Sequence, residues 1–556
     1  MSCLQTIVGA TGGLSASVGA QTDARDADHR AGKVEGDDRS TSVQPTANPP
    51  RHGSLARDPT GETPVPQLLV PQLLVPQLLV PQRRRRRSVL EIVSKSERSL
   101  KAAIVLMAAA LLVMVLVSGQ FWSVHTLFPR SVLGRTFWII MLAYGATMYA
   151  TLVWRISLWR RYRPMLFVAD DKLPTVSVII PAYNEGLLVR QAILSAAASR
   201  YPTDRLEIIA IDDGSGDDTW PHILAAARQA RQRVRVTTLR QPTNQGKRRA
   251  LYLGFARARG DVFVTMDSDS VLERDSLRNA VTPLVRDPAI GCVAGCVQVL
   301  NPRDSLMTRF LKCTFSLSFK FVRAYQNEFR GVFCTPGALS VYRAEVVRGI
   351  ADEWLNQRFL GRPCVTGEDR AMTNLFLREG WLTAYQGNAV VWCKMPHDYT
   401  GLIRMFLRWA RSNIRETLFL FRFMFSRFRT RYLHAFRINM LLAAMSLVVP
   451  VVLISNSLAL LATDDGYLLR HVGVVIMYAM TVSVIYYRNE RDSDWVWLFV
   501  YGFFWVACLS WILPYAALTL RNTGWLTRQA PAGSTTEDDS DSVSALRFAS
   551  RWAPAA

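Results

Sequence analysis

The sequence predicts an α/β domain inserted between transmembrane helices, and three observations support this fold class. Hydrophobic residues make up 50% of the 556 residues. Charged residues make up only 20%, below the roughly 25% of ordinary soluble domains. Uncharged stretches long enough to cross a bilayer lie on both sides of a central region in which apolar, β-rich runs alternate with segments of helical period. That alternation is typical of an open, mostly parallel sheet with helices on its faces.

The two ends of the chain are predicted to be disordered. Residues 1–88 form a leader rich in Gly, Ser, Thr, Asp and Pro, and they contain PQLLV three times in tandem. Proline at every fifth position removes backbone donors too often for a helix or an inner strand. No signal peptide is expected, because the first residues lack a basic region followed by a compact apolar stretch. Residues 529–556 form the second disordered segment.

Residues 89–164 are predicted to hold two transmembrane helices. Residues 102–122 and 136–154 carry no charge, and each stretch approaches or exceeds the ~20 residues needed to cross a bilayer. Basic residues flank their outer ends, namely residues 83–87, Lys101, Arg155, Arg160, Arg161 and Arg163. Because basic flanks stay inside, the chain after Arg163 is expected in the cytoplasm of a multi-pass inner-membrane protein. The five-arginine block could also bind nucleic acid or act as a nuclear-targeting signal. Its place beside a predicted span indicates instead that it sets the orientation of that helix in the membrane, and we expect no nucleic-acid partner.

Residues 401–528 are predicted to return the chain to the bilayer. Residues 401–437 are dense in Arg and Phe, which suits amphipathic helices lying on the inner membrane face. Residues 438–462 and 472–487 are read as two transmembrane helices, and the second is short for a span. The last apolar segment, residues 495–520, contains Pro514 and is expected to be re-entrant or interfacial, with a third span in this region as the alternative.

Residues 165–400 are predicted to form the cytoplasmic catalytic domain. The expected strands cover residues 176–182, 206–212, 234–239 and 262–267. The expected helices cover residues 187–198, 220–230, 247–258 and 370–379. Ligands of such sheets collect at the carboxyl ends of the strands. The eight cysteines are scattered and lack paired metal-ligand spacing, so we expect them to be reduced.

Acidic residues follow two of the predicted strands. Asp213 follows the run LEIIAI-Asp212, and Asp267 and Asp269 follow VFVTM. Carboxylates two residues apart in an extended chain point to one side. One or two carboxylates plus substrate phosphates commonly bind magnesium, so Asp267 and Asp269 are candidate ligands for Mg²⁺ or Mn²⁺. Taken singly, each motif is also compatible with a turn and a helix cap.

Two later motifs complete the pattern. Glu368 and Asp369 open a predicted helix, where their carboxylates could cap the helix or act as a base. Arg408 and Trp409 stand in the Arg- and Phe-rich region, where they could be interfacial anchors. The order of these motifs on one α/β domain points to transfer from a metal-bound nucleotide diphosphate.

Five longer motifs carry a resemblance to a known family. They are VIIPAYNE (178–185), NQGKRRA (244–250), CTPG (334–337), NQRFLGRPCVTGEDRAMTN (356–374) and RWARSNIRE (408–416). With the closing WLTR (525–528), they resemble the processive membrane branch of family 2 glycosyltransferases, which have the GT-A (nucleotide-diphospho-sugar transferase) fold. Class I hyaluronan synthases and the rhizobial chitooligosaccharide synthase are the most similar, over residues 90–530. Met405 and Leu526 depart from the family pattern, which has Gln and Gly at these positions.

The resemblance implies a role for each candidate residue. The nucleotide sugar would contact Tyr183, Glu185, Asp213, Lys247, Asp267 and Arg528. Asp269, with Asp267, would hold the metal. The acceptor would contact Cys334, Trp409 and Trp525. Asp369 would act as the general base, while Arg408 neutralises the departing diphosphate and Trp409 supports the acceptor sugar.

The resemblance also implies a function. We expect a processive, inverting glycosyltransferase that polymerises and exports a β-linked polysaccharide, as hyaluronan synthases do. Its partners would be UDP-N-acetylglucosamine, UDP-glucuronate, the nascent polysaccharide acceptor and the lipid bilayer. A chitin-like or other N-acetylglucosamine polymer or oligomer is the alternative product. Single transfer to a lipid acceptor is a further alternative, and a non-catalytic membrane protein is another.

Overall fold

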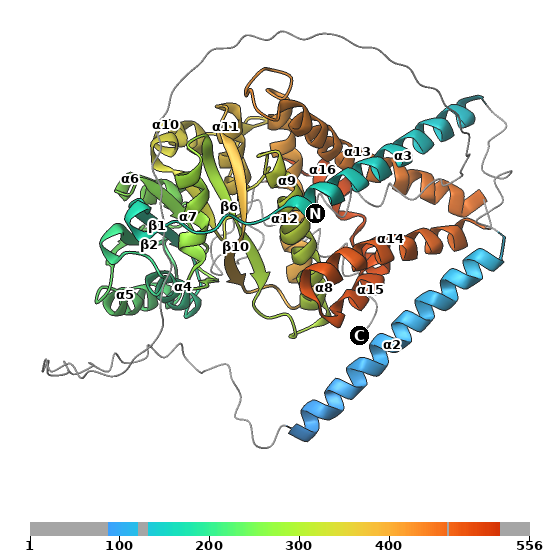
Figure 1. The fold of residues 1–556 in the computed structure, drawn as a ribbon, viewed down its shortest axis with the longest axis horizontal. Helices are drawn as coiled ribbons and strands as arrows, with labels where there is room; N and C mark the ends of the chain where they lie inside the picture. Colours follow the sequence, from blue (N-terminus) through green and yellow to red (C-terminus); the bar gives the residue numbers. More distant parts are fainter. Residues whose placement is uncertain (1–86, 120–131, 464–465, 523–556) are drawn as a thin grey trace, which may run out of the picture. The chain divides into compact units, whose positions relative to one another are not determined.

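The computed structural model describes residues 87–119, 132–463 and 466–522 (Figure 1). The residues from Arg98 onward belong to one compact unit. The predictions made for residues 1–86 of the leader, for the tail and for Trp525 and Arg528 lie outside the described residues. Arg87 and Ser88, predicted to end the disordered leader, instead begin the helix α2.

An eight-stranded mixed sheet forms the centre of the domain, in the order β3-β2-β1-β4-β7-β6-β10-β5. The strands are β1 Val176–Ala182, β2 Leu206–Asp212, β3 Arg235–Arg240, β4 Val262–Thr265, β5 Ser270–Leu272, β6 Ile290–Val299, β7 Ser340–Arg343 and β10 Leu382–Cys393. The first four in that order run parallel, while β7 is antiparallel to both of its neighbours. The predicted strands are confirmed to within one or two residues.

Helices cover both faces of this sheet. They are α4 Leu188–Ala197, α5 Thr219–Ala230, α6 Lys247–Arg257, α7 Ser276–Arg286, α10 Ala344–Leu355 and α11 Glu368–Arg378. Along β1, Val178 and Ile180 pack in the core that includes α4, α5 and α7, whereas Ile179 packs in the core of α6, α10 and α11. This two-sided burial explains why the strands are apolar at nearly every position rather than at every second one.

The topology brings several of the sequence motifs to the same edge of the sheet. Because β1, β2 and β4 are parallel, their carboxyl ends lie along the same edge. The helices α6 and α11 also begin at this edge, with Lys247 and Glu368 as their first residues. The motifs of the sequence therefore converge through the sheet order, although they are far apart in the chain.

Long helices flank the domain in the chain. They are α2 Arg87–Val117, α3 Val132–Arg161, α13 Leu433–Thr463 and α14 Tyr467–Glu490. A last helical segment consists of η6 Ser493–Val496, α15 Trp497–Phe504, η7 Trp505–Leu509 and α16 Ile512–Leu518. Within the described residues, four stretches are long and apolar enough to cross a membrane, namely Ser96–Val117, Leu433–Val451, Tyr467–Glu490 and Ser493–Leu518. The predicted span at 136–154 lies in α3, which is not one of these four, and stays a prediction.

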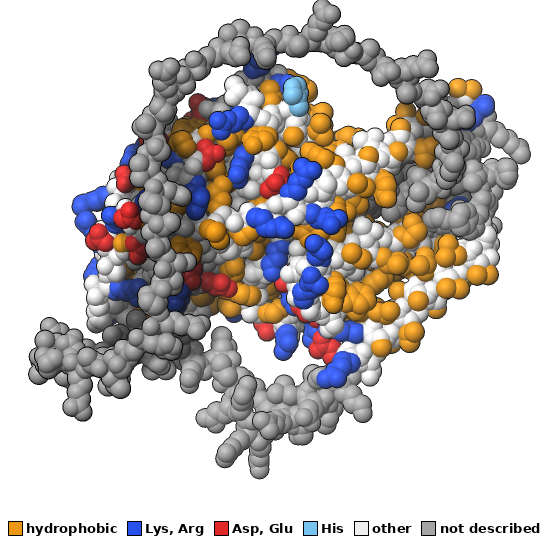
Figure 2. Space-filling model, viewed as in Figure 1, with side chains coloured by type: hydrophobic (Ala, Val, Ile, Leu, Met, Phe, Trp, Pro, Cys, Tyr) orange, Lys and Arg blue, Asp and Glu red, His pale blue; other side chains and the backbone are white. Residues whose placement is uncertain are grey.

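Apolar side chains cover the outer faces of the long helices (Figure 2). Examples are Leu106 on α2, Val448 on α13 and Val484 on α14, with 70%, 63% and 70% of their surface exposed. Soluble domains rarely expose apolar side chains over several long helices, so this exposure indicates that the helices face lipid. Lys and Arg side chains gather where these helices meet the sheet domain. The chain is therefore a membrane protein.

The remaining helices connect the two regions. They are α8 Leu306–Ser316, the π-helix η5 Leu317–Arg323, α9 Ala324–Glu328 and α12 Tyr399–Phe421, and the short hairpin β8 Arg358–Phe359 and β9 Arg362–Pro363 precedes α11. The helix α12 falls in the region predicted to be interfacial. One of its faces is buried, and that face packs on α11 and on α16.

Packing of α6 on the sheet requires a small residue at Gly254. A Cβ atom there would lie 2.4 Å from Ile179 Cγ2 and 2.9 Å from Ile211 Cδ1. We expect Gly254→Ala to destabilise the protein by about 1–3 kcal/mol, since buried side chains must shift. Gly349→Ala is the matched control, because a Cβ on α10 meets nothing within 4 Å, and it should stabilise by up to about 1 kcal/mol. Thermal unfolding of the detergent-solubilised full chain measures both, and equal midpoints would contradict this packing.

Candidate active site

The first part of the site lies where β1 and β2 end. Asp213 follows β2, and its backbone N–H donates to the carbonyl of Ala182 at 2.9 Å. Its Oδ1 accepts hydrogen bonds from Gln241 Nε2 at 2.6 Å and from the backbone N–H of Gln245 at 2.9 Å. Burial raises the pKa of Asp213 to about 6, although these backbone donors oppose the rise. Asp213 is therefore held in place at the edge of the sheet, with its acid strength weakened.

The turn after β1 contacts the acidic segment after β4. The side chain of Glu185 accepts a hydrogen bond from Ser268 Oγ at 2.9 Å, and its backbone N–H donates to Thr219 Oγ1 at 2.8 Å. Ser268 stands between the two candidate metal ligands. The structure thus brings the VIIPAYNE motif next to the Asp-Ser-Asp motif, as a shared nucleotide site requires. Tyr183 lies in the same turn and is partly exposed.

The candidate metal ligands follow β4. Asp267 Oδ1 lies 2.5 Å from Lys247 Nζ, and Asp269 Oδ1 accepts a hydrogen bond from Ser270 Oγ at 3.4 Å. Both carboxylates keep some exposure, so a ligand can reach them. Burial and the neighbouring charge of Asp267 raise the pKa of Asp269 to about 6, which Lys247 only partly offsets. A carboxylate that is costly to ionise is one that a cation would stabilise.

The residues present fit a divalent metal held jointly with a substrate. Within the described residues, no group of three or more His, Cys, Asp or Glu side chains is arranged as a complete metal site. Two carboxylates alone leave most positions of an octahedral ion to water and to phosphate oxygens, which is the usual arrangement for Mg²⁺. Asp267 and Asp269 would hold the ion, and the choice between Mg²⁺ and Mn²⁺ is not made by this donor set, since both prefer oxygen ligands.

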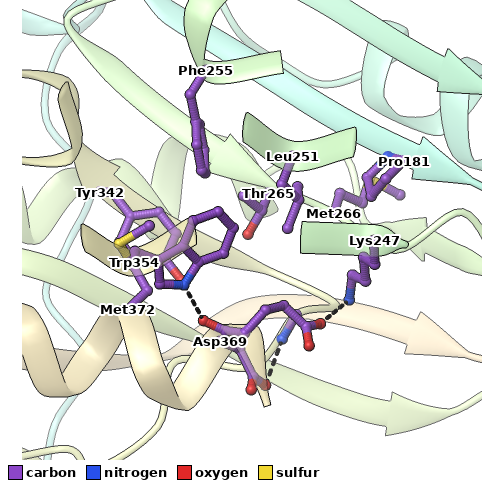
Figure 3. Close-up of a pocket in the computed structure, with 12 residues that line it drawn as sticks. Pro181, Lys247, Leu251, Phe255, Thr265, Met266, Tyr342, Trp354, Asp369 and Met372 are labelled. Carbon is purple, nitrogen blue, oxygen red and sulfur yellow. Dashed lines mark hydrogen bonds and ion pairs between the residues drawn. The ribbon is translucent and has the colours of Figure 1, made fainter. Parts of the chain in front are cut away.

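A pocket lies between the first turn of α6 and the first turn of α11 (Figure 3). Leu251, Phe255 and Trp354 form its apolar side, and Lys247 and Asp369 lie at its polar side. The indole Nε1 of Trp354 donates to the backbone carbonyl of Glu368 at 2.8 Å, which anchors the first turn of α11. The pocket therefore presents charged groups at the end of a hydrophobic chamber.

Asp369 is oriented by three donors. Its Oδ1 accepts from the backbone N–H of Arg370 at 2.7 Å, and its Oδ2 accepts from the backbone N–H of Gly337 at 3.2 Å. The thiol of Cys334 also donates to Oδ2, at 3.6 Å. Burial, followed by the charge of Glu368, raises the pKa of Asp369. A carboxylate with a raised pKa is a stronger base, so these surroundings suit proton removal from a sugar hydroxyl.

Lys247 makes two ionic contacts that the sequence did not indicate. Its ammonium group bridges Asp267 and Glu368, with Nζ 2.6 Å from Glu368 Oε1. The reason is geometric, because α6 begins at Lys247 and its first turn faces the start of α11 across the pocket. The contact of Lys247 with the nucleotide sugar stays a prediction.

The helix α12 contributes the Arg-Trp pair. Burial by itself raises the pKa of Glu368, but Lys247 and, after it, the charge of Arg408 lower this pKa to about 2. The ring of Trp409 packs against Phe315 and Phe406, with centroid distances of 6.0 Å and 5.9 Å. Arg408 is thus electrostatically part of the site, while part of the Trp409 ring is buried among aromatic side chains.

A buried polar network fixes α12 to α11. Glu416 is fully buried, and its carboxylate accepts from Asn374 Nδ2 at 3.1 Å and from Gln357 Nε2 at 3.3 Å. Arg370 Nη2 donates to Thr417 Oγ1 at 2.8 Å. The sequence analysis assigned no role to these residues. All of them except Thr417 belong to the two longest family-like motifs, but the spacing of these motifs does not indicate that they pair with each other.

The fold and the site together define a nucleotide-sugar-dependent glycosyltransferase. The family model described as Glycosyl transferase family 2 matches residues 177–350. An N-acetylglucosaminyltransferase of Rhizobium sp. is 30% identical over 364 residues, which cover 65% of this chain and 79% of that protein. An N-acetylglucosaminyltransferase of Azorhizobium caulinodans is 30% identical over 362 residues, covering 64% and 88%. The chain belongs to glycosyltransferase family 2.

A solved structure overlaps the domain more loosely. It is a mannosyltransferase from Pyrobaculum calidifontis in complex with GDP-Man and Mn²⁺, with 22% identity, a TM-score of 0.40 and coverage of 62% of this chain and 97% of that one. The relatives confirm the expected family and its rhizobial branch, whereas the resemblance to hyaluronan synthases stays a prediction.

The raised pKa of Asp213 gives a test of its predicted contact with uracil. A pKa of about 6 means that Asp213 loses its charge as the pH falls through that value, well above the range in which an exposed aspartate does so. Between about one unit above and one unit below the pKa, the ionised population falls roughly tenfold. If the carboxylate accepts a hydrogen bond from uracil, the affinity for UDP should fall by a similar factor, as measured by calorimetry. Asp213→Asn should bind UDP more weakly and keep only the pH dependence of UDP itself; an unchanged profile would contradict the contact.

Proposed function

We propose that the protein transfers N-acetylglucosamine from UDP-N-acetylglucosamine to a growing β-linked chain at the inner face of the membrane. The observation that carries this proposal is that Asp369, whose pKa is raised by burial, lines the same pocket as Lys247, and that Lys247 in turn pairs with the proposed metal ligand Asp267. The named relatives favour N-acetylglucosamine as the sugar. They thereby favour a chitin-like or other N-acetylglucosamine product over hyaluronan.

In this mechanism the chain's own groups position the donor and move one proton. Tyr183, Glu185 and Asp213 hold the nucleoside end at the ends of β1 and β2. Asp267 and Asp269 would hold a divalent cation, which would supply positive charge to the departing diphosphate. Lys247 and Arg408 add positive charge on the same side, and such preorganised charge is a large part of enzymatic rate acceleration.

Asp369 completes the reaction on the acceptor. Its carboxylate removes the proton from the acceptor hydroxyl, whose oxygen attacks the anomeric carbon from the face opposite UDP. The new C–O bond forms as the bond to the diphosphate breaks, so an α-linked donor gives a β-linkage. Cys334 and Trp409 line the acceptor side, where an aromatic ring matches the apolar face of a pyranose. Trp525 and Arg528, outside the described residues, are proposed to close the site.

The contacts of the last apolar segment support an interfacial placement for it. Near its start, Asp494 pairs with Lys312 on α8 at 2.5 Å. Just after its end, Thr519 accepts a hydrogen bond from Arg411 Nε on α12 at 3.1 Å. Both ends of residues 493–518 therefore meet helices that contact the catalytic domain, which favours a re-entrant or interfacial path over a simple span. We propose a cytoplasmic catalytic domain at residues 165–400 and a re-entrant or interfacial segment after α14.

Two other products remain to be separated by experiment. Hyaluronan requires UDP-glucuronate as a second donor, and single transfer to a lipid requires no repeated addition. A growing polar chain needs a path lined by protein to cross hydrocarbon, and the helices on both sides of the domain could supply it. Processive synthesis with export is thus the proposal that gives these helices a function.

Replacing the base tests the mechanism. Asp369→Asn removes the proton acceptor and keeps the size of the side chain. We expect UDP binding within about twofold of wild type and a turnover lower by about 10² to 10⁴. UDP release from UDP-N-acetylglucosamine measures turnover, and calorimetry measures binding. The exposed Asp352→Asn is the control and should keep wild-type turnover; normal turnover in Asp369→Asn would refute the assignment.

The product can be identified directly. The purified full chain is incubated with UDP-N-acetylglucosamine and a divalent metal, with and without UDP-glucuronate. We expect oligomers or polymers that chitinase degrades and that form without UDP-glucuronate. A product that needs both donors and is cut by hyaluronidase would establish the hyaluronan reading instead. A single sugar on a lipid would establish the non-processive reading.

A further inference from the structure

Lys247 forms the centre of the charged site. Its Nζ lies 2.5 Å from Asp267 Oδ1 and 2.6 Å from Glu368 Oε1, so one ammonium joins the end of β4 to the start of α11. Its side chain is 16% exposed and that of Glu368 only 7%. The pair is thus shielded from solvent, and ionic contacts in shielded positions are stronger than ionic contacts on a protein surface.

The chain makes room for this arrangement at Gly337. A Cβ atom on Gly337 would lie 2.7 Å from Lys247 Nζ and 3.4 Å from both carboxylate oxygens of Asp267. Any larger residue would therefore press on the ammonium where it sits. The backbone N–H of the same residue donates to Asp369. The absence of a side chain at Gly337 therefore allows Lys247 and Asp369 to lie close to the same backbone segment.

The ammonium of Lys247 and a divalent cation would compete for the same carboxylate, that of Asp267. Asp267 is a proposed metal ligand, yet its Oδ1 is already bound to an ammonium group. The charge of Lys247 also acts on Asp269, the second proposed ligand. Two cations close to one carboxylate repel each other strongly at low dielectric, so a metal ion and this lysine cannot both keep their best positions.

We propose that Lys247 is a resident counter-cation, held by Glu368 against Asp267 when no donor is bound, and released to the diphosphate when metal and nucleotide enter together. The inference rests on the proposed metal site. Metal alone must displace the ammonium without giving it a new partner. Metal with UDP provides diphosphate oxygens for the lysine, so the two ligands bind cooperatively, and by linkage each raises the affinity for the other by the same factor. Glu368 and Gly337 are then positioning residues for Lys247.

Manganese binding to the full chain in detergent tests the inference without any turnover. Free Mn²⁺ is measured by electron paramagnetic resonance, with and without UDP. In the wild type, UDP should tighten Mn²⁺ binding by about tenfold or more beyond the affinity of UDP alone for the ion, within the usual range of coupling between sites. Lys247→Met should bind Mn²⁺ without UDP about tenfold more tightly than wild type, and the effect of UDP should shrink.

Three further variants separate the possible causes. Lys247→Arg keeps a cation and should stay near wild type without UDP. Arg249→Met removes an exposed positive charge from the same helix and should also stay near wild type, which controls for long-range charge. Gly337→Ala pushes the ammonium away while keeping it in the chain, and it should tighten Mn²⁺ binding in the same direction as Lys247→Met, so the test survives misfolding of either variant.

The outcomes are distinct. If wild type binds Mn²⁺ with UDP but neither Lys247→Met nor Gly337→Ala binds it more tightly without UDP, the counter-cation inference is wrong and the proposed metal site stands. An equal gain in Arg249→Met would also overturn the inference. If wild type binds no Mn²⁺ even with UDP, the proposed metal site fails and the inference fails with it.

Discussion

Negative charge concentrated at one edge of the sheet is the constraint on which the rest of the site depends. Asp267, Asp269, Glu368 and Asp369 all interact electrostatically with the single ammonium of Lys247. Burial by itself lowers the pKa of Lys247, but Asp267 and Glu368 raise it above its usual value. The lysine therefore stays charged, and the carboxylates can stay close together. Without a cation in this space, their mutual repulsion would oppose the fold of the site.

The sheet order is what creates this concentration. Strands β1, β2 and β4 bring the turns that bear Tyr183, Asp213 and Asp267 to one edge, while α11 brings Asp369 from more than a hundred residues further along the chain. The apolar core on each side of β1 holds these elements in register. Enzymes of this kind thus place their chemistry at the rim of a rigid layer, and the loops at that rim carry the specificity.

The sequence predicts the sheet well because both of its faces are covered. Runs that are apolar at nearly every position, such as residues 176–182, predict an inner parallel strand. It also predicts Asp213, Asp267 and Asp369, because acidic residues at strand and helix ends stand out. It does not predict that Lys247 pairs with Glu368, or that Glu416 pairs with Gln357 and Asn374. Those contacts depend on how helices pack in three dimensions, and neither periodicity nor local spacing encodes that packing. The names of the relatives, rather than any single residue of this chain, favour a product made from N-acetylglucosamine alone over the hyaluronan that the sequence led us to expect.

The network around Glu416 has a mechanical consequence. A fully buried carboxylate that accepts hydrogen bonds from Asn374 and Gln357 cannot leave them without a large desolvation cost. The helix α12 and the first turns of α11 must then shift as one body. A displacement of α12 would therefore be transmitted through Asn374 to α11, whose first turn carries the carboxylate of Asp369.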